Sequence, residues 1–176
     1  MSGIQVLLVA GTHGNEINAT WLFEQWSKNN DLVKTSGIKV ARVIGNPKAY
    51  KNGLRYLDKD LNRSFLADVY STSDNLIYER ERSKDLLNDF GVNGNRPCQI
   101  ALDFHSTTSS MGSCLVVYGR RFCDLALASL IQHRLGLPVY LHEADKAQIG
   151  FLVEAWPCGL VIEIGAVPQS SLQADI

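Results

Sequence analysis

Two side chains that commonly bind metal ions, His13 and Glu16, follow the apolar segment 4–10 and lie three positions apart. Where a loop enters a helix, this spacing can direct both side chains to one point. A third candidate, His105, ends the apolar segment 99–105. Catalytic zinc usually has three protein ligands drawn from His, Asp and Glu, with one position open for water. These residues predict one Zn2+ ion per chain, although the first pair alone would also fit a helix-capping or solvent-exposed role.

Three carboxylates toward the C-terminal end are candidates for a general base. Glu163 stands inside the apolar segment 160–165, and Glu143 and Glu154 lie in or near other apolar segments. Glu163 is the hardest of the three to explain as a surface residue. A buried carboxylate has to be paired, next to a metal or catalytic, and its pKa is then raised. We therefore predict that Glu163 is the catalytic carboxylate.

Asp103, two residues before His105, has two roles that the sequence leaves open. It could orient a ligand imidazole from behind, or it could pair with an arginine or a backbone amide. The remaining histidines are His133, in a predicted helix, and His142, at a predicted strand end. We interpret both as surface residues or as residues that are satisfied inside the fold.

The chain alternates short apolar segments with amphipathic ones, which is typical of an α/β fold. Strands are predicted over 4–10, 38–45, 99–105, 113–119, 137–143 and 160–165, and helices over 15–30, 75–90 and 123–135. Strands that are apolar on both faces indicate a sheet covered by helices on both sides. We therefore expect a three-layer α/β/α architecture with a mostly parallel or mixed central sheet.

Polar residues follow three of these strands at the point where each strand ends. His13 and Glu16 follow the first strand, Asn46 follows the second, and Asp103 and His105 end the third. In open α/β sheets the ligand site lies outside the carboxyl ends of the strands. These side chains are therefore expected to form one site, with Asn46 as a substrate-binding residue.

Composition and charge limit the kinds of partner. The chain has 176 residues, 45% of them hydrophobic, which suits one domain with a sizeable core. Its formal net charge is -1 with acids and bases mixed, which argues against nucleic-acid and membrane-surface binding. No apolar stretch approaches the roughly 20 residues that span a bilayer, and the first residues lack a signal-peptide pattern. The four cysteines form no CxxC pair. We expect a cytoplasmic protein with reduced thiols.

Four stretches resemble, in order, the signature blocks of the aspartoacylase and succinylglutamate desuccinylase family. They are GTHGNE (11–16), NPKAYKNGLRYLDKDLNRSF (46–65), DFHSTTSSMG (103–112) and VIEIGAVPQ (161–169). The likeness runs from about residue 5 to the last residue and is nearest to the aspartoacylase branch. The resemblance implies the fold of the zinc carboxypeptidase-like hydrolases and a zinc-hydrolase catalytic domain over residues 1–176.

The resemblance also implies the residues of the active site. They are the zinc ligands His13, Glu16 and His105, the general base Glu163, the carbonyl-polarising Arg55, and Asn62 with Arg63 for the α-carboxylate of the substrate. The chemistry of these groups suits the roles. Amide hydrolysis needs an activated water, a donor for the developing oxyanion and a proton for the leaving amine. The planar fork of an arginine matches a carboxylate.

We therefore expect a zinc-dependent amidohydrolase that acts on a small-molecule N-acyl amino acid, foremost N-acetyl-L-aspartate, and releases a carboxylate and L-aspartate. The alternatives are an aminoacylase for other N-acyl amino acids, a metallocarboxypeptidase, and an inactive fold that serves as a binding module. Aspartoacylases carry an arginine and a tyrosine for the β-carboxylate shortly before the general base. Here Lys146 is the only cation over 146–163, which favours the broader class of N-acyl amino acids.

The end of the chain raises a further expectation. Family members continue into a β-rich domain that overhangs the pocket, whereas residues 171–176 read as the first turn of a helix. We expect this chain to lack that domain, and a homo-oligomer is among the states that we expect.

Overall fold

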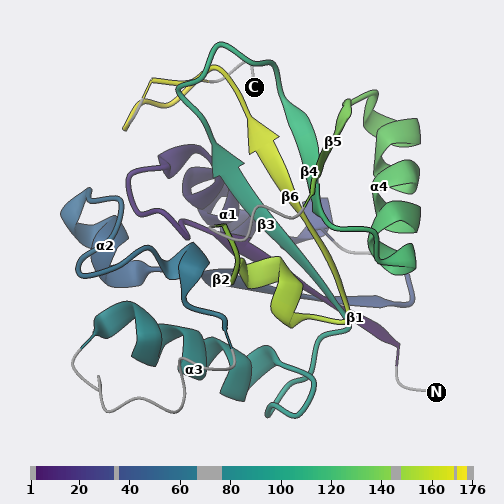
Figure 1. Ribbon diagram of the computed structural model, residues 1–176, viewed down its shortest axis with the longest axis horizontal. Helices are drawn as coiled ribbons and strands as arrows, with labels where there is room; N and C mark the ends of the chain where they lie inside the picture. The colour runs from purple at the N-terminus through teal and green to yellow at the C-terminus, as the bar shows by residue number, and fades with distance from the viewer. Residues whose placement is uncertain (1–2, 34–35, 67–76, 144–147, 169, 174–176) are drawn as a thin grey trace.

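The computed structural model describes residues 3–33, 36–66, 77–143, 148–168 and 170–173 (Figure 1). Helices and strands alternate along the chain, as the hydrophobic patterns predict. The strands are β1 (Ile4–Ala10), β2 (Ile38–Ile44), β3 (Ile100–Ser106), β4 (Cys114–Tyr118), β5 (Val139–His142) and β6 (Cys158–Ile164). The α-helices are α1 (Ile17–Lys28), α2 (Pro47–Asn52), α3 (Tyr78–Phe90) and α4 (Phe122–Leu135), and short 3-10 turns are η1 (Asn30–Val33), η2 (Leu61–Arg63) and η4 (Leu152–Ala155).

The six strands form one mixed sheet in the order β2-β1-β3-β6-β4-β5. β2, β1, β3 and β6 run parallel to one another. β4 reverses the direction, because it pairs antiparallel with β6 and parallel with β5. The carboxyl ends of β1, β3 and β6 therefore meet at one edge of the sheet, as expected for an α/β ligand site.

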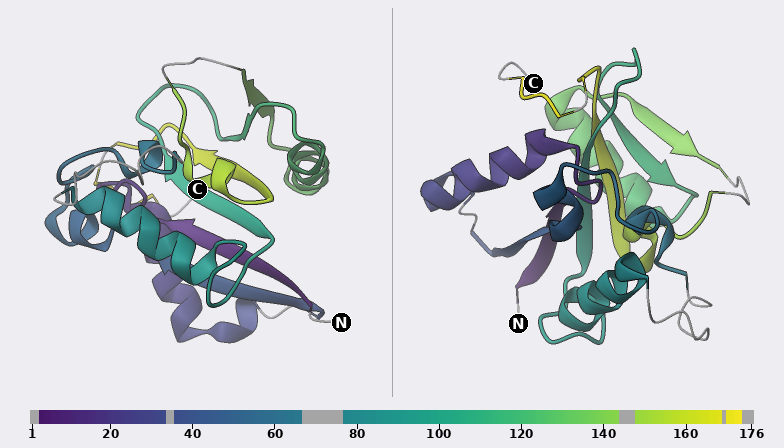
Figure 2. Two further views of the ribbon diagram at one scale, coloured as in Figure 1. Left: turned by 60° about the horizontal axis from the view of Figure 1, so that its bottom comes forward. Right: turned by 90° about the vertical axis from the view of Figure 1, so that its left-hand side faces the viewer.

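Helices cover both faces of this sheet. Phe23 of α1 packs against β1, and Ala128 of α4 packs against β4 and β6, on one face. On the opposite face, Leu86 and Phe90 of α3 and Trp156 beside η4 pack against β1, β3 and β6. Figure 1 shows α3 and η4 in front of the sheet and α1 behind it, and the right view of Figure 2 shows α1 to the left of the strands. The expected three-layer α/β/α architecture is confirmed.

Helix α2 forms in a stretch for which the sequence analysis predicts neither a helix nor a strand. The Asn46 side chain accepts a hydrogen bond from Ala49 N at 3.1 Å and so caps the helix, and Pro47 takes its first position. Gly53 ends the helix with a φ of 63°. The Asn-Pro pair that ends β2 therefore also starts a helix.

Two further expectations concern the end of the chain and the membrane. Residues 171–173 are not helical, so that described part does not form the expected first turn of a helix. Lys146 and residues 174–176 lie outside the described residues. None of the helices in the described ranges is long and apolar enough to cross a membrane.

Candidate metal and substrate site

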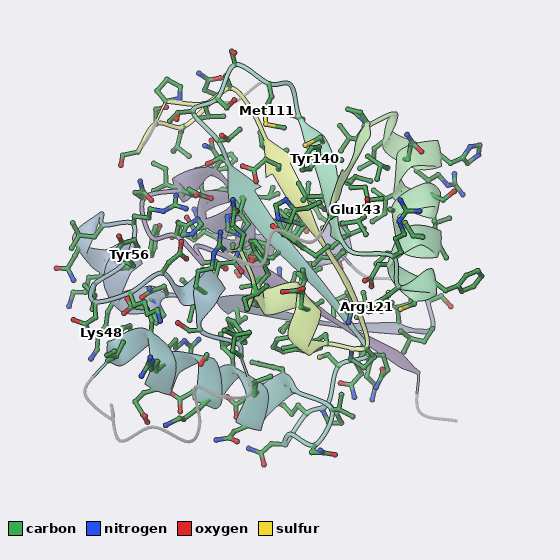
Figure 3. The ribbon with its side chains drawn as sticks, in the orientation of Figure 1. Lys48, Tyr56, Met111, Arg121, Tyr140 and Glu143 are labelled. Carbon is green, nitrogen blue, oxygen red and sulfur yellow. The ribbon has the colours of Figure 1, made fainter. Side chains whose placement is uncertain are left out.

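A pocket begins at the carboxyl ends of β1, β3 and β6 and extends over the sheet face that carries α3. Its floor follows strand register: Val161 of β6 pairs with Val116 of β4, which pairs with Tyr140 of β5. Because alternate residues of a strand share a face, Glu163 and Tyr118 lie on this floor as well. Figure 3 shows two lining residues, Met111 and Tyr140, toward the upper end of the sheet.

His13, Glu16 and His105 meet at the inner end of the pocket. His13 Nδ1 lies 2.7 Å from Glu16 Oε1, and His105 Nδ1 lies 3.0 Å from Glu16 Oε2. One ligand atom from each residue lies within 4.8 Å of the other two. All three side chains are buried. The structure thus brings together the three residues that the sequence predicts as metal ligands.

Two glycines let the loop that carries His13 turn after β1. Gly11 has a φ of 64°, which is costly for other residues. A Cβ on Gly14 would meet the backbone of Ala49 and Tyr50 at 2.2 Å, so this loop packs directly against α2. Gly14 N also donates to Arg55 O at 3.1 Å. The loop is therefore fixed by contacts within the protein.

Carboxylates behind the two imidazoles fix their orientation. His105 Nε2 lies 2.8 Å from Asp103 Oδ2, while Thr12 Oγ1 donates to the other Asp103 oxygen at 2.7 Å. His13 Nε2 lies 3.0 Å from Asp60 Oδ1. Of the two roles left open for Asp103, the structure places it behind His105. Each imidazole thus has a carboxylate at Nε2 and directs Nδ1 toward Glu16, and a carboxylate on the second ring nitrogen is typical of metal-binding histidines.

The electrostatics of this cluster favour positive charge at its centre. Burial opposes ionisation of Glu16, but the neighbouring His105 and His13 hold the pKa of its carboxyl well below the usual range. Burial likewise opposes charge on His105, but Asp103 and Glu16 raise the pKa of its imidazole well above its ordinary value. Two imidazoles and a carboxylate, each backed by a carboxylate or a backbone donor, fit a divalent zinc ion.

Glu163 lies beside this cluster, because it pairs in register with His105 on the neighbouring strand. Burial raises the pKa of its carboxyl, although the nearby His105 partly offsets the effect. The other two carboxylates lie elsewhere. Glu143 is exposed and bonds to Arg120, and the Glu154 carboxylate accepts from Phe151 N at 3.0 Å at the start of η4. Of the three, Glu163 is the one that lines the pocket.

Two arginines and an asparagine from the segment after α2 also line the pocket. Arg55 Nη1 lies 3.4 Å from Glu16 Oε1, and its side chain is 46% exposed, so it remains accessible to a ligand. Asn62 is buried, and its Oδ1 accepts from Leu152 N at 2.7 Å. This bond fixes the amide with its Nδ2 donor free of hydrogen bonds to the described residues. The Arg63 guanidinium lies 4.0 Å above the Phe151 ring centroid.

Asn46, predicted as a substrate-binding residue, is placed differently. It is fully buried, caps α2 through its Oδ1 and donates from Nδ2 to Glu79 Oε1 at 3.0 Å. It is absent from the described pocket lining. Its side chain is used inside the protein because α2, which the sequence analysis missed, starts at this residue.

Glu79 is a residue with a positioning role that the sequence analysis missed. Its buried carboxylate accepts from the backbone N–H groups of Leu57, Asp58 and Lys59 at 2.7 to 3.1 Å, as well as from Asn46. It therefore holds the segment between Arg55 and Asp60. The helical spacing offered a signal, because Glu79 shares the buried stripe of α3 with Ser83, Leu86 and Phe90.

The outer pocket also contains residues that the sequence analysis did not assign. Tyr118 and Phe151 stack with ring centroids 3.8 Å apart, and His142 lies against both rings. Asn15 lines the inner end, where its Oδ1 is buried without a hydrogen bond to the described residues. His142 thus lines the pocket with its Nε2 unpaired among the described residues, whereas the sequence analysis interprets it as a surface residue or as one satisfied inside the fold.

The fold defines a class, that of the carboxypeptidase-like α/β folds. Carboxypeptidase A from Helicoverpa armigera shares this fold, with a TM-score of 0.62 at 14% identity over 96% of this chain and 54% of that chain. The particular family follows from the sequence. Residues 2–176 match the family model described as Succinylglutamate desuccinylase/Aspartoacylase catalytic domain, and the chain belongs to this family.

Two relatives illustrate the relationship. A probable aspartoacylase from a strain of Prochlorococcus marinus is 64% identical over 176 residues, which are 100% of this chain and 57% of the relative. The crystal structure of murine aminoacylase 3 has a TM-score of 0.85 at 29% identity over 99% of this chain and 60% of that chain. The chain therefore spans a little over half the length of these relatives.

Proposed function

We propose that this chain is the catalytic part of a zinc-dependent amidohydrolase that cleaves N-acyl-L-amino acids, foremost N-acetyl-L-aspartate, to a carboxylate and the free amino acid. The observation that carries the proposal is the convergence of His13, Glu16 and His105 within 4.8 Å, beside Glu163 and under Arg55. Membership of the succinylglutamate desuccinylase and aspartoacylase family supports the same reaction class.

His13, Glu16 and His105 would hold the zinc ion. Bound zinc supplies Lewis acidity, which lowers the pKa of water and polarises a carbonyl oxygen. Glu163 takes a proton from the attacking water, and its raised pKa suits it to return that proton to the leaving nitrogen. Arg55 donates to the carbonyl oxygen as negative charge develops there.

The neighbouring segment binds the amino-acid part of the substrate. Arg63 offers a planar guanidinium that matches a carboxylate with two parallel hydrogen bonds, and Asn62 adds an amide donor. The bond from Leu152 N to Asn62 Oδ1 and the stacking of Arg63 on Phe151 hold these two groups before substrate arrives. A substrate held in this way needs less ordering at the moment of reaction.

The test combines zinc analysis with hydrolysis assays on this chain and on a chain extended to the length of its relatives. We expect one zinc per chain and release of free amino acid from N-acetyl-L-aspartate in the extended chain. Parallel assays on N-acetyl-L-phenylalanine and on a dipeptide separate the aminoacylase and peptidase alternatives. Zinc binding without turnover of any substrate by either chain would favour a binding module and overturn the proposal.

A further inference from the structure

His142, on the edge strand β5, has a buried polar atom that has no hydrogen-bond partner among the described residues. This atom is the imidazole Nε2. The ring is held by its neighbours: Tyr118 pairs with His142 in register, with ring centroids 5.4 Å apart, and Phe151 lies at 5.8 Å. His142 is therefore a fixed donor or acceptor in the wall of the pocket.

An unpaired buried nitrogen costs stability, so most such atoms in proteins have a partner. At a pocket wall, a bound molecule can supply that partner. The described lining residues whose rings contact His142 are Tyr118, Tyr140 and Phe151, which offer apolar faces. A ligand oxygen that binds among these rings can supply the hydrogen-bond partner that the described residues do not give to Nε2.

One aromatic ring connects His142 to the group that recognises the α-carboxylate. Phe151 contacts the Arg63 guanidinium at 4.0 Å and the His142 ring at 5.8 Å. A single small molecule with two carboxylates would bind beside this ring to reach both groups. Arg55 and Glu163 have other roles in the proposed reaction, because Arg55 donates to the substrate carbonyl and Glu163 takes a proton from the attacking water.

We propose that His142 is the residue that recognises the substrate side chain, by donating a hydrogen bond from Nε2–H to the side-chain carboxylate of an N-acyl acidic amino acid. This inference rests on the proposed function. It assigns the preference among N-acyl amino acids to the edge strand β5 and not to the metal-binding end of the pocket.

The test compares kcat and KM for N-acetyl-L-aspartate and for the similarly shaped N-acetyl-L-leucine. His142→Phe keeps an aromatic ring in the stack and removes the donor. We expect its KM for N-acetyl-L-aspartate to rise roughly ten- to a hundredfold, the loss typical of a hydrogen bond to a charged group, with kcat and the KM for N-acetyl-L-leucine little changed. His142→Gln restores an N–H donor and should recover part of the loss.

His133→Phe is the matched control, because His133 is an exposed histidine on α4, outside the described pocket lining. Equal losses on both substrates in His142→Phe, or no loss on either, would overturn the inference while leaving the proposed function intact. Calorimetric binding of L-aspartate and L-leucine to the zinc-loaded proteins tests the role of His142 when no hydrolysis can be measured. If no N-acyl amino acid is hydrolysed, the proposed function fails, and unchanged L-aspartate affinity in His142→Phe would then overturn the role of His142 independently.

Discussion

The inner end of the pocket, where we propose that His13, Glu16 and His105 bind zinc (the metal-binding end), differs from the outer wall on β4 and β5 in how its polar atoms are used. At the metal-binding end, both nitrogens of His13 and of His105 face carboxylates at 2.7 to 3.0 Å. On the outer wall, aromatic rings hold His142 in place, but its Nε2 has no partner among the described residues. The first region is organised before any ligand binds, whereas the second has a polar atom available for one.

This difference predicts which part of the pocket controls the rate of reaction and which part controls the preference among substrates. A site with fixed, mutually bonded groups stabilises the developing charge of a transition state without reorganising. A wall with a spare donor distinguishes ligands, because only some of them fill that position. Substitutions at the metal-binding end should therefore lower the rate on every substrate, and those on the outer wall should change the preference among substrates.

The largest expected effect comes from the metal ligands. His105→Ala removes an imidazole and leaves Asp103 and Glu16 facing a gap, so most bound zinc should be lost together with turnover on all substrates. Elemental analysis after dialysis, with His133→Ala as the control, measures this. A variant that keeps one full zinc equivalent at unchanged affinity would show that the ligand set is different.

Glu163→Gln should have the next largest effect. The amide keeps the shape of the side chain but cannot accept a proton, so kcat should fall at least about a hundredfold while the zinc content stays at the wild-type level. Glu143→Gln, which changes an exposed carboxylate, is the control. Nearly wild-type turnover in Glu163→Gln would assign the general base to another group.

The two arginines should separate into a rate effect and a binding effect. Arg55→Ala should lower kcat by roughly ten- to a hundredfold, because its partner charge develops in the transition state. Arg63→Lys should raise KM about tenfold with a smaller change in kcat, because an ammonium cannot reproduce the bidentate fork. Steady-state kinetics on N-acetyl-L-aspartate measures both, and the reverse pattern would exchange the two roles.

The smallest effect on activity is expected from Glu79, which touches no substrate in the proposed reaction. Glu79→Gln keeps one acceptor for the segment that carries Arg55 and should lower kcat only several-fold, since misplacement of a catalytic group reduces rate. Glu79→Ala leaves three backbone N–H groups without their acceptor and should destabilise the fold by about 3 kcal/mol or more in urea unfolding. Glu81→Ala, on the exposed face of the same helix, should stay within about 0.5 kcal/mol of the wild type. Equal stability of the two alanine variants would contradict the role of Glu79.

Local patterns in the sequence determined most of the secondary structure and singled out the three candidate metal ligands. Apolar runs rich in β-branched residues predicted all six strands, and helical spacing predicted α1, α3 and α4, with ends that differ by a few residues. His13, Glu16 and His105 could be placed together from the sequence because the first two follow an apolar strand, the third ends another, and parallel strands end at one edge. Glu163 could be singled out because burying a carboxylate inside an apolar strand costs free energy unless the group is paired, next to a metal or catalytic.

Only the tertiary structure decided which polar residues face the pocket. The period of a strand does not reveal its direction, so nothing local indicated that β4 runs antiparallel to β6 and pairs Tyr118 with His142 at the pocket wall. Asn46 and Glu79 likewise could not be placed from local sequence, because they bond within the protein and not toward the pocket. Their side chains bond to each other across 33 positions of sequence, and Glu79 also holds a segment some 20 residues away. Hydrogen bonds between segments so distant along the chain arise from packing, because spacing within one segment specifies which face a residue occupies but not what lies opposite that face.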